Sequence, residues 1–108
     1  LLMVEGEGGV RELPEILETP TLDGIFLGPM DLSHALGVPG EMGHLRVVET
    51  IVGVIDACRA KAMTTGIFAG STEAARRWFG RGVTLVAAGV DTQHFLAGLK
   101  RIVTEVRG

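Results

Sequence analysis

The chain has 108 residues, 46% of them hydrophobic and 21% charged, and a formal net charge of −3. One domain is the most that this length supports, and the composition excludes a disordered tail and a coiled coil. The acidic balance, without basic runs, argues against a nucleic-acid partner. No apolar stretch is long enough to span a membrane and no signal peptide is recognisable. The single cysteine, Cys58, cannot form an internal disulfide, so we expect a cytoplasmic protein.

Short apolar runs that do not alternate with polar residues predict parallel strands buried on both faces. Four such runs occur, at residues 1–4, 24–27, 65–69 and 83–88. The first run opens the chain without a polar lead-in, as the interior of a buried strand would. We therefore expect the chain to be a piece of a longer domain.

Helical patterns separate and follow these runs. The first, residues 9–17, contains Pro14, which either kinks or starts a helix. The clearest, residues 44–62, has one apolar stripe formed by Val48, Ile51, Val52, Ile55 and Cys58. A third, residues 72–79, is capped by Ser71 or Thr72. The last starts at a capping Asp91 and has an apolar side formed by Phe95, Leu96, Leu99, Ile102, Val103 and Val106.

This order of elements predicts an α/β fold with a parallel sheet and right-handed crossovers. Two architectures fit the pattern. One is a small doubly wound sheet, complete in itself. The other is four βα units, half of an eightfold barrel that usually has ~250 residues. The residues between 28 and 43 are predicted to form a long loop at a strand's carboxyl end, where α/β proteins place their chemistry.

Two acidic residues follow neighbouring predicted strands, Glu5 after the first and Asp31 after the second. Because adjacent parallel strands lie ~4.8 Å apart, both carboxylates can reach one divalent cation. An all-oxygen pair suits Mg²⁺ or Mn²⁺ rather than structural zinc. The alternative for each residue is stabilisation of a helix dipole.

Other chemistry is less well supported. Lys61 and Lys100 fall on helices away from the strand ends, which disfavours imine chemistry. Ser33 has no base and orienting acid in the pattern, so we expect a turn or capping serine. The three histidines are expected to be surface or capping residues; they are His34, His44 and His94.

The segment from Gly28 to Gly40, which begins Gly-Pro-Met-Asp-Leu-Ser and continues with Leu-Gly-Val-Pro-Gly, resembles the GPxDLS-x-x-LG-x-PG segment of the HpcH/HpaI aldolase family. Met3-Val4-Glu5 resembles that family's strand ending in glutamate. Residues 66–69 and 86–91 are similar to its last two barrel strands. The resemblance covers essentially the whole chain, residues 1–108, as the C-terminal half of the family's domain.

Membership implies a (β/α)8 barrel and a metal-dependent aldolase that forms or cleaves a C–C bond between pyruvate, a 2-oxo acid, and an aldehyde through a metal-stabilised enolate. By resemblance, Glu5 and Asp31 become the metal ligands, for Mg²⁺ or Mn²⁺, with Co²⁺ as a further candidate. Gly28 and Pro29 shape the turn, and the amides of Met30 and Asp31 hold the carboxylate of the 2-oxo acid. The resemblance also implies a homo-oligomer.

Phe68 lies where the family places an apolar residue near the aldehyde pocket. The chain departs from the family at Met3, where many members have glutamine. The family's histidine base and its pyruvate-binding arginine lie in strands absent here, so we assign no catalytic residue to this chain and expect it to be weakly active or inactive alone.

Two rival functions remain. One is an acyl-CoA lyase similar to the citrate lyase β-subunit, which the intact segment disfavours. The other is a non-catalytic module that self-associates through the open edges of a half-barrel.

Overall fold

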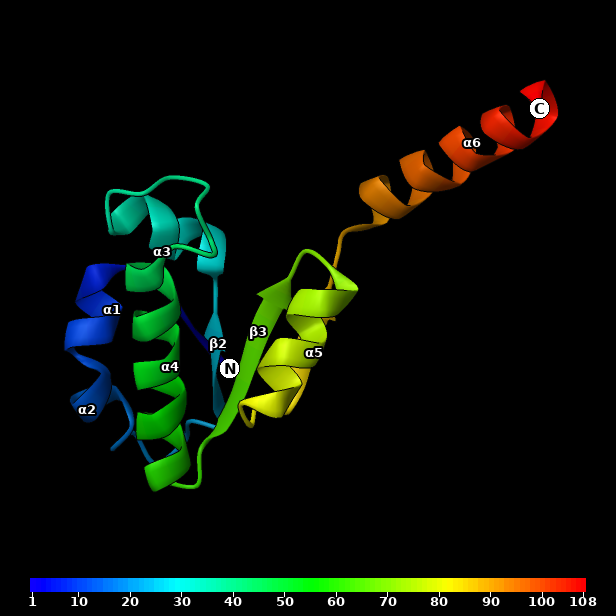
Figure 1. The fold of residues 1–108 in the computed structure, drawn as a ribbon. Coiled ribbons are helices and arrows are strands. Elements are labelled where there is room, and N and C mark those ends of the chain that lie inside the picture. The colour runs from blue at the N-terminus through cyan, green and yellow to red at the C-terminus, as the bar shows by residue number, and fades with distance from the viewer.

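The computed structural model describes residues 1–108 and contains a four-stranded parallel sheet in the order β1-β2-β3-β4. Figure 1 shows the sheet with helices packed beside it and one helix extending away from it. The elements are, in chain order, β1 (Leu2–Val4), α1 (Glu7–Arg11), α2 (Leu13–Ile16), β2 (Gly24–Leu27), α3 (Pro29–Ala35), α4 (Leu45–Ala60), β3 (Thr64–Ala69), α5 (Thr72–Gly80), β4 (Leu85–Ala88) and α6 (Asp91–Arg107).

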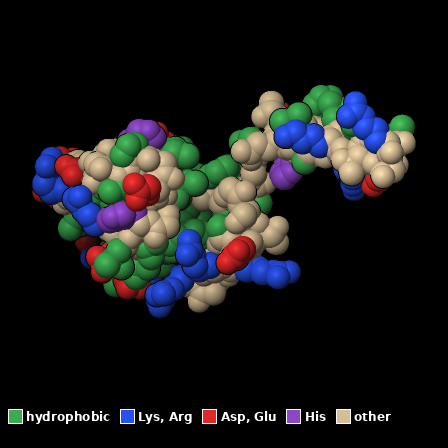
Figure 2. Space-filling model, turned by 45° about the horizontal axis from the view of Figure 1, so that its top comes forward, with side chains coloured by type: hydrophobic (Ala, Val, Ile, Leu, Met, Phe, Trp, Pro, Cys, Tyr) green, Lys and Arg blue, Asp and Glu red, His purple; other side chains and the backbone are tan.

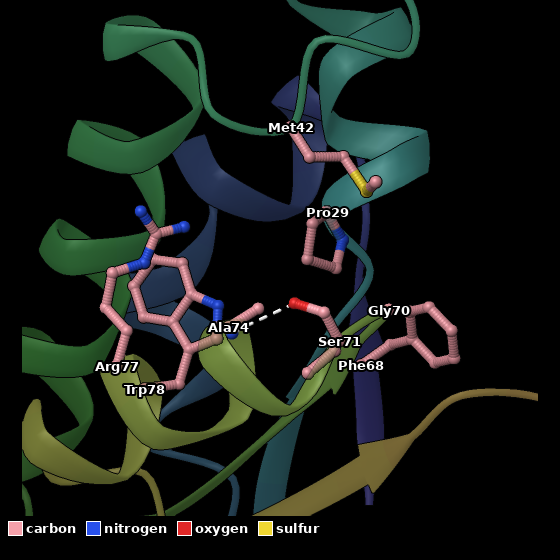
Figure 3. A pocket seen from close by; sticks show the side chains of 9 residues that line it. Pro29, Met42, Phe68, Gly70, Ser71, Ala74, Arg77 and Trp78 are labelled. Atoms are coloured by element: carbon pink, nitrogen blue, oxygen red, sulfur yellow. Dashed lines mark hydrogen bonds between the residues drawn. The ribbon is translucent and has the colours of Figure 1, made fainter.

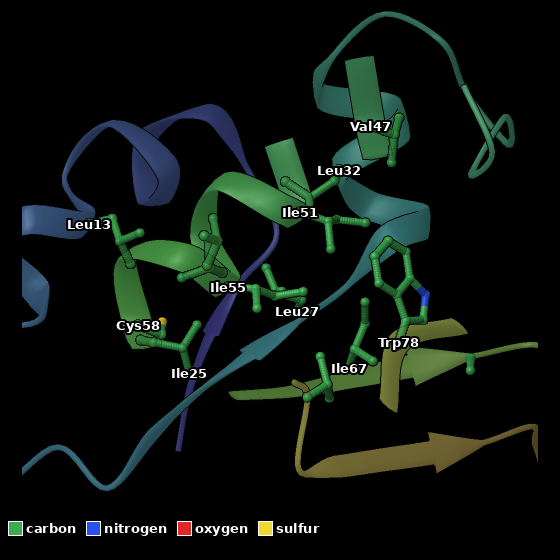
Figure 4. Close-up of a cluster of buried hydrophobic side chains, with 14 of the residues drawn as sticks. Leu13, Ile25, Leu27, Leu32, Val47, Ile51, Ile55, Cys58, Ile67 and Trp78 are labelled. Atoms are coloured by element: carbon green, nitrogen blue, oxygen red, sulfur yellow. The ribbon is translucent and has the colours of Figure 1, made fainter. Parts of the chain in front are cut away.

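The core lies on one face of the sheet only. Val4, Leu27 and Ile67 occupy one row across β1, β2 and β3, and each is almost completely buried. They form a single cluster with side chains from the helices, the largest contribution coming from α4 (Figure 4). A doubly wound sheet needs helices on both faces. The sequential strand order and the one-sided core therefore identify the fold as four βα units of a (β/α)8 barrel.

The opposite face of the sheet is the concave inner face of this half-barrel. One row across it consists of Met3, Phe26, Gly66 and Leu85. Met3 is 54% exposed and Leu85 is 44% exposed. A Cβ atom on Gly66 would lie 2.7 Å from the Phe26 ring, so the close approach of that ring requires glycine. An apolar surface thus lies open along the sheet.

The observed elements confirm most of the predicted ones. The strand at residues 24–27 has the predicted bounds, and Ile51, Ile55 and Cys58 of the predicted stripe are buried in α4. The Ser71 hydroxyl caps α5 by accepting a hydrogen bond from the Ala74 amide at 3.1 Å. The predicted first helix is instead two short helices, with Pro14 in the first turn of α2, where its missing N–H costs nothing.

The prediction of a continuous loop over residues 28–43 is wrong, because α3 occupies its first part. Pro29 is the first residue of that helix, a position that its fixed φ favours. The side chain of Leu32 is fully buried and anchors α3 to the core. The many glycine and proline residues of this segment favoured the prediction of a loop, although its first part forms a helix of only two turns.

The last helix, α6, projects from the body of the molecule and has no buried residue (Figure 1). Its predicted apolar side is present but uncovered, and Figure 2 shows hydrophobic side chains along this arm. The predicted cap at Asp91 needs correction, since Val90 occupies the N-cap position. The Asp91 carboxylate accepts a hydrogen bond only from the adjacent Thr92 amide, at 2.7 Å. No helix is long and apolar enough to cross a membrane.

Candidate functional site

The carboxylates of Glu5 and Asp31 face each other across Gly28. Glu5 directly follows β1, and Asp31 lies in the first turn of α3 after β2. The two strands end together, since Val4 pairs with Leu27 and the Gly28 amide donates to the Val4 carbonyl at 3.4 Å. A Cβ atom on Gly28 would lie 3.5 Å from Asp31 Oδ2 and 3.6 Å from Glu5 Oε2. The parallel register therefore brings the two acids together, as the sequence predicted.

Both carboxylates lie free at the surface of this end of the sheet. Neither takes part in an ion pair or a side-chain hydrogen bond, and both residues are exposed. Two negative charges around one glycine repel each other, and a cation between them would relieve that repulsion. No group of three or more histidine, cysteine, aspartate or glutamate side chains gathers there. This donor set suits Mg²⁺, which binds through one or two carboxylates and fills its other positions with water and substrate oxygens.

Backbone donors lie beside the acid pair. Met30 and Asp31 are the second and third residues of α3, where N–H groups have no acceptor within the helix. Pro29, the first residue, has no N–H to contribute. Gly28 precedes them in an extended conformation, φ −107° and ψ 91°. The turn thus presents two amides next to two carboxylates, and the first turn of α3 can accept an anionic group.

Ser33 is a structural residue of α3. It is fully buried, and its hydroxyl donates to the Met30 carbonyl at 2.5 Å and accepts from the Gly40 amide at 2.9 Å. These bonds tie the first turn of α3 to the segment that follows the helix. The expectation of a turn or capping serine is therefore wrong, because Ser33 lies within α3, but its role is structural, since its hydroxyl holds the Met30 carbonyl against the Gly40 amide.

A hollow of about 270 Å³ lies between the start of α3 and α5 (Figure 3). Pro29 and Phe68, both predicted to contact substrate, are part of its wall, whereas Glu5 and Asp31 are not. The remaining lining residues are Met42, Ala69, Gly70, Ser71, Ala74, Arg77 and Trp78. The candidate substrate-binding residues therefore fall into two groups. Pro29 and Phe68 line the apolar hollow, whereas Gly28, Met30 and Asp31 do not and belong to the turn that contains the acid pair.

Sequence reasoning missed Met42 and Arg77 as members of the wall. The Arg77 guanidinium lies 5.1 Å from the centroid of the Trp78 ring and forms no ion pair. Trp78 itself is buried, as a residue that packs α5 on the sheet. The helical spacing of Ser71, Ala74 and Trp78 could have indicated this face of α5. Nothing in the sequence pattern indicated Met42, because its position depends on the path of the chain after α3.

The remaining candidates have structural roles. The side chain of His44 caps α4 by accepting from the Arg46 amide at 3.2 Å. His34 Nδ1 lies 2.9 Å from the Met30 carbonyl one helical turn away, and His94 Nε2 lies 3.3 Å from the Ala88 carbonyl. Cys58 is a buried residue of α4, and desolvation by burial raises the pKa of its thiol above 9.0, against a smaller opposing effect of a hydrogen bond with Thr65.

The strand order and the one-sided core define half of a (β/α)8 barrel. The acid pair lies where β1 and β2 end, at the edge of the sheet where such barrels place their active sites. The chain belongs to the HpcH/HpaI aldolase/citrate lyase family, whose model matches residues 1–97. A solved HpcH/HpaI aldolase/citrate lyase family protein from Burkholderia cenocepacia superimposes with a TM-score of 0.93 at 35% identity, over 98% of this chain and 41% of that one.

Curated relatives point to the same family. A hydroxypyruvate/pyruvate aldolase from Pseudomonas aeruginosa is 34% identical over all of this chain and 40% of its own length. A 2-keto-3-deoxy-L-rhamnonate aldolase from Klebsiella pneumoniae is 37% identical over 94% of this chain and 38% of its own length. The chain thus spans about 40% of the length of these relatives.

Proposed function

We propose that this chain is the metal-binding half of a divalent-metal-dependent aldolase that joins or cleaves pyruvate, or a closely related 2-oxo acid, and an aldehyde. The observation that carries the proposal is the pair of carboxylates, Glu5 and Asp31, on either side of Gly28. The names of the relatives support an aldolase rather than an acyl-CoA lyase, since the curated relatives described above are named as aldolases of 2-oxo acids.

Each candidate residue has a distinct task in this reaction. Glu5 and Asp31 would hold Mg²⁺ or Mn²⁺, with Co²⁺ as a further candidate. When bound, such an ion supplies Lewis acidity that stabilises negative charge on the keto oxygen. The amides of Met30 and Asp31 would orient the carboxylate of the 2-oxo acid by hydrogen bonds. Gly28 keeps the space between the two acids open.

The aldehyde would occupy the neighbouring hollow. Pro29 and Phe68 form apolar parts of its wall, and they would exclude water from the carbon that forms the new bond. His34 and His44 make local contacts with the backbone through Nδ1, and neither is assigned the role of the base. A general base contributes about 10²- to 10⁴-fold, so the 108 residues alone would turn over slowly or not at all.

The proposed setting is the cytoplasm. The single cysteine is a buried thiol without a disulfide partner, as expected in a reducing compartment. Small 2-oxo acids and aldehydes are the substrates that such a site would meet there.

Calorimetric titration with Mn²⁺, with and without pyruvate, tests the proposal directly. The unaltered chain is expected to bind Mn²⁺ with micromolar affinity, and pyruvate is expected to tighten that binding. Glu5→Gln and Asp31→Asn should each abolish the heat of binding, because each removes one of two charged ligands. Glu49→Gln, at an exposed acid on α4, is the matched control and should bind as the unaltered chain does. Equal binding by all four chains, or no binding by a folded chain, would refute the assignment.

A further inference from the structure

One wall of the hollow is formed by a side chain that the core does not use. Met42 lies in the segment between α3 and α4 and is partly buried. It lines the hollow, yet it belongs neither to the core cluster nor to the residues packed against that cluster. We propose that Met42 limits the length of the aldehyde that the hollow accepts. The inference rests on the proposed aldolase function, because that function places the aldehyde in the hollow.

Several other walls of the hollow are fixed by packing or capping. Trp78 is 3% exposed and belongs to the core, and Ala74, one turn earlier in α5, packs against the same core. Pro29 is buried at the start of α3, and the Ser71 hydroxyl is engaged in capping α5. Figure 3 shows Met42 and Pro29 on the α3 side of the hollow and Trp78 on the α5 side. Met42 is therefore a wall that can be shortened without opening the core.

The backbone that carries Met42 is held on both sides. Before it, the Gly40 amide donates to the Ser33 hydroxyl at 2.9 Å. After it, the His44 amide donates to the Glu41 carbonyl at 2.9 Å and closes a turn around Met42. The Ser33 hydroxyl also bonds to the first turn of α3, whose amides would hold the 2-oxo acid. The position of Met42 is thus fixed relative to the turn that would bind the other substrate.

The hollow belongs to the interior of the sheet rather than to an edge of it. Its walls come from α3, the segment after α3, the end of β3 and α5, and β3 pairs with a strand on each side. The Met42 side chain is unbranched and apolar, so it covers the chain of a short aldehyde but occupies the space that further methylenes would need. Each methylene that a ligand buries raises its affinity about fourfold. Removing the thioether should therefore favour longer ligands.

Fluorescence of Trp78 measures occupancy of the hollow, because it is the single tryptophan of the chain and lines the hollow. The probes are propan-1-ol and pentan-1-ol, which stand in for aldehydes of the same length and do not react with lysine. In Met42→Ala, the ratio of the Kd of propan-1-ol to that of pentan-1-ol should rise by up to about 15-fold, the product of two fourfold steps. Leu45→Ala is the matched control, since Leu45 is 66% exposed and lies outside the hollow. A thermal melt of each variant verifies that it is folded.

The outcomes separate the role of Met42 from the aldolase function. A rise in the ratio for Met42→Ala, with no rise for Leu45→Ala, supports the proposal. A ratio within about twofold of that of the unaltered chain, an equal rise in both variants, or no response of a folded chain to either alcohol would overturn it. The Mn²⁺ titration without alcohol does not involve Met42. Mn²⁺ binding that pyruvate tightens, together with an unchanged alcohol ratio, would therefore refute the role of Met42 alone, whereas a failed Mn²⁺ titration would refute the aldolase function.

Discussion

Replacing Gly28 by alanine should weaken binding at the proposed metal site without unfolding the protein. The added methyl would lie 3.4 Å from Glu5 Cβ, 3.5 Å from Asp31 Oδ2 and 3.6 Å from Glu5 Oε2, all ordinary van der Waals contacts. The backbone at Gly28 has φ −107°, which alanine adopts without strain. Restriction of the unfolded chain can even add about 0.4–1 kcal/mol to the free energy of unfolding.

The same methyl occupies the space between the two carboxylates. A cation bonded to both oxygens at about 2.0–2.6 Å would have to share that space, together with its water ligands. We expect Mn²⁺ affinity to fall at least tenfold, which corresponds to about 1.4 kcal/mol of binding free energy.

Calorimetry with Mn²⁺ and a thermal melt of the same sample measure the two effects. Gly43→Ala is the control, since a Cβ atom there meets nothing within 4 Å. A Gly28→Ala chain that melts like the unaltered protein and binds Mn²⁺ equally well would show that the space across Gly28 is not the metal site.

Two further predictions concern stability. Ser33→Ala removes a buried hydroxyl and leaves the Gly40 amide without its acceptor. The free energy of unfolding, measured with urea, should fall by about 1–3 kcal/mol. An unchanged urea midpoint would contradict the role given to Ser33. Burial raises the pKa of Cys58 above 9.0, so the unfolded thiol ionises first as pH rises. The buried neutral thiol therefore contributes fully to the free energy of unfolding below pH 9.0. This contribution is lost as the pH rises from 9.0 through the higher pKa of the folded state. Urea unfolding at neutral and alkaline pH should show this loss relative to Cys58→Ala, and parallel pH profiles for the two chains would refute it.

The sequence by itself determined the local elements. The continuous apolar runs located the strands, and helical spacing identified Ile51, Ile55 and Cys58 as buried residues of α4. It also placed Glu5 and Asp31 shortly after two successive strands, because both strands were recognisable from local composition. Such features depend on residues close together in the chain.

Only the tertiary structure decided between the two architectures. Strand order and the choice of covered face follow from pairings between residues far apart in sequence, such as Val4 with Leu27 and Leu27 with Ile67. Local periodicity contains no information about such pairings. The position of Gly28 between two carboxylates, and the hydrogen bond from Gly40 to Ser33, likewise appear only when separate segments are placed against each other. The apolar side of α6 could be predicted from its spacing, but not that it lies uncovered, because burial depends on what the rest of the chain places beside a helix.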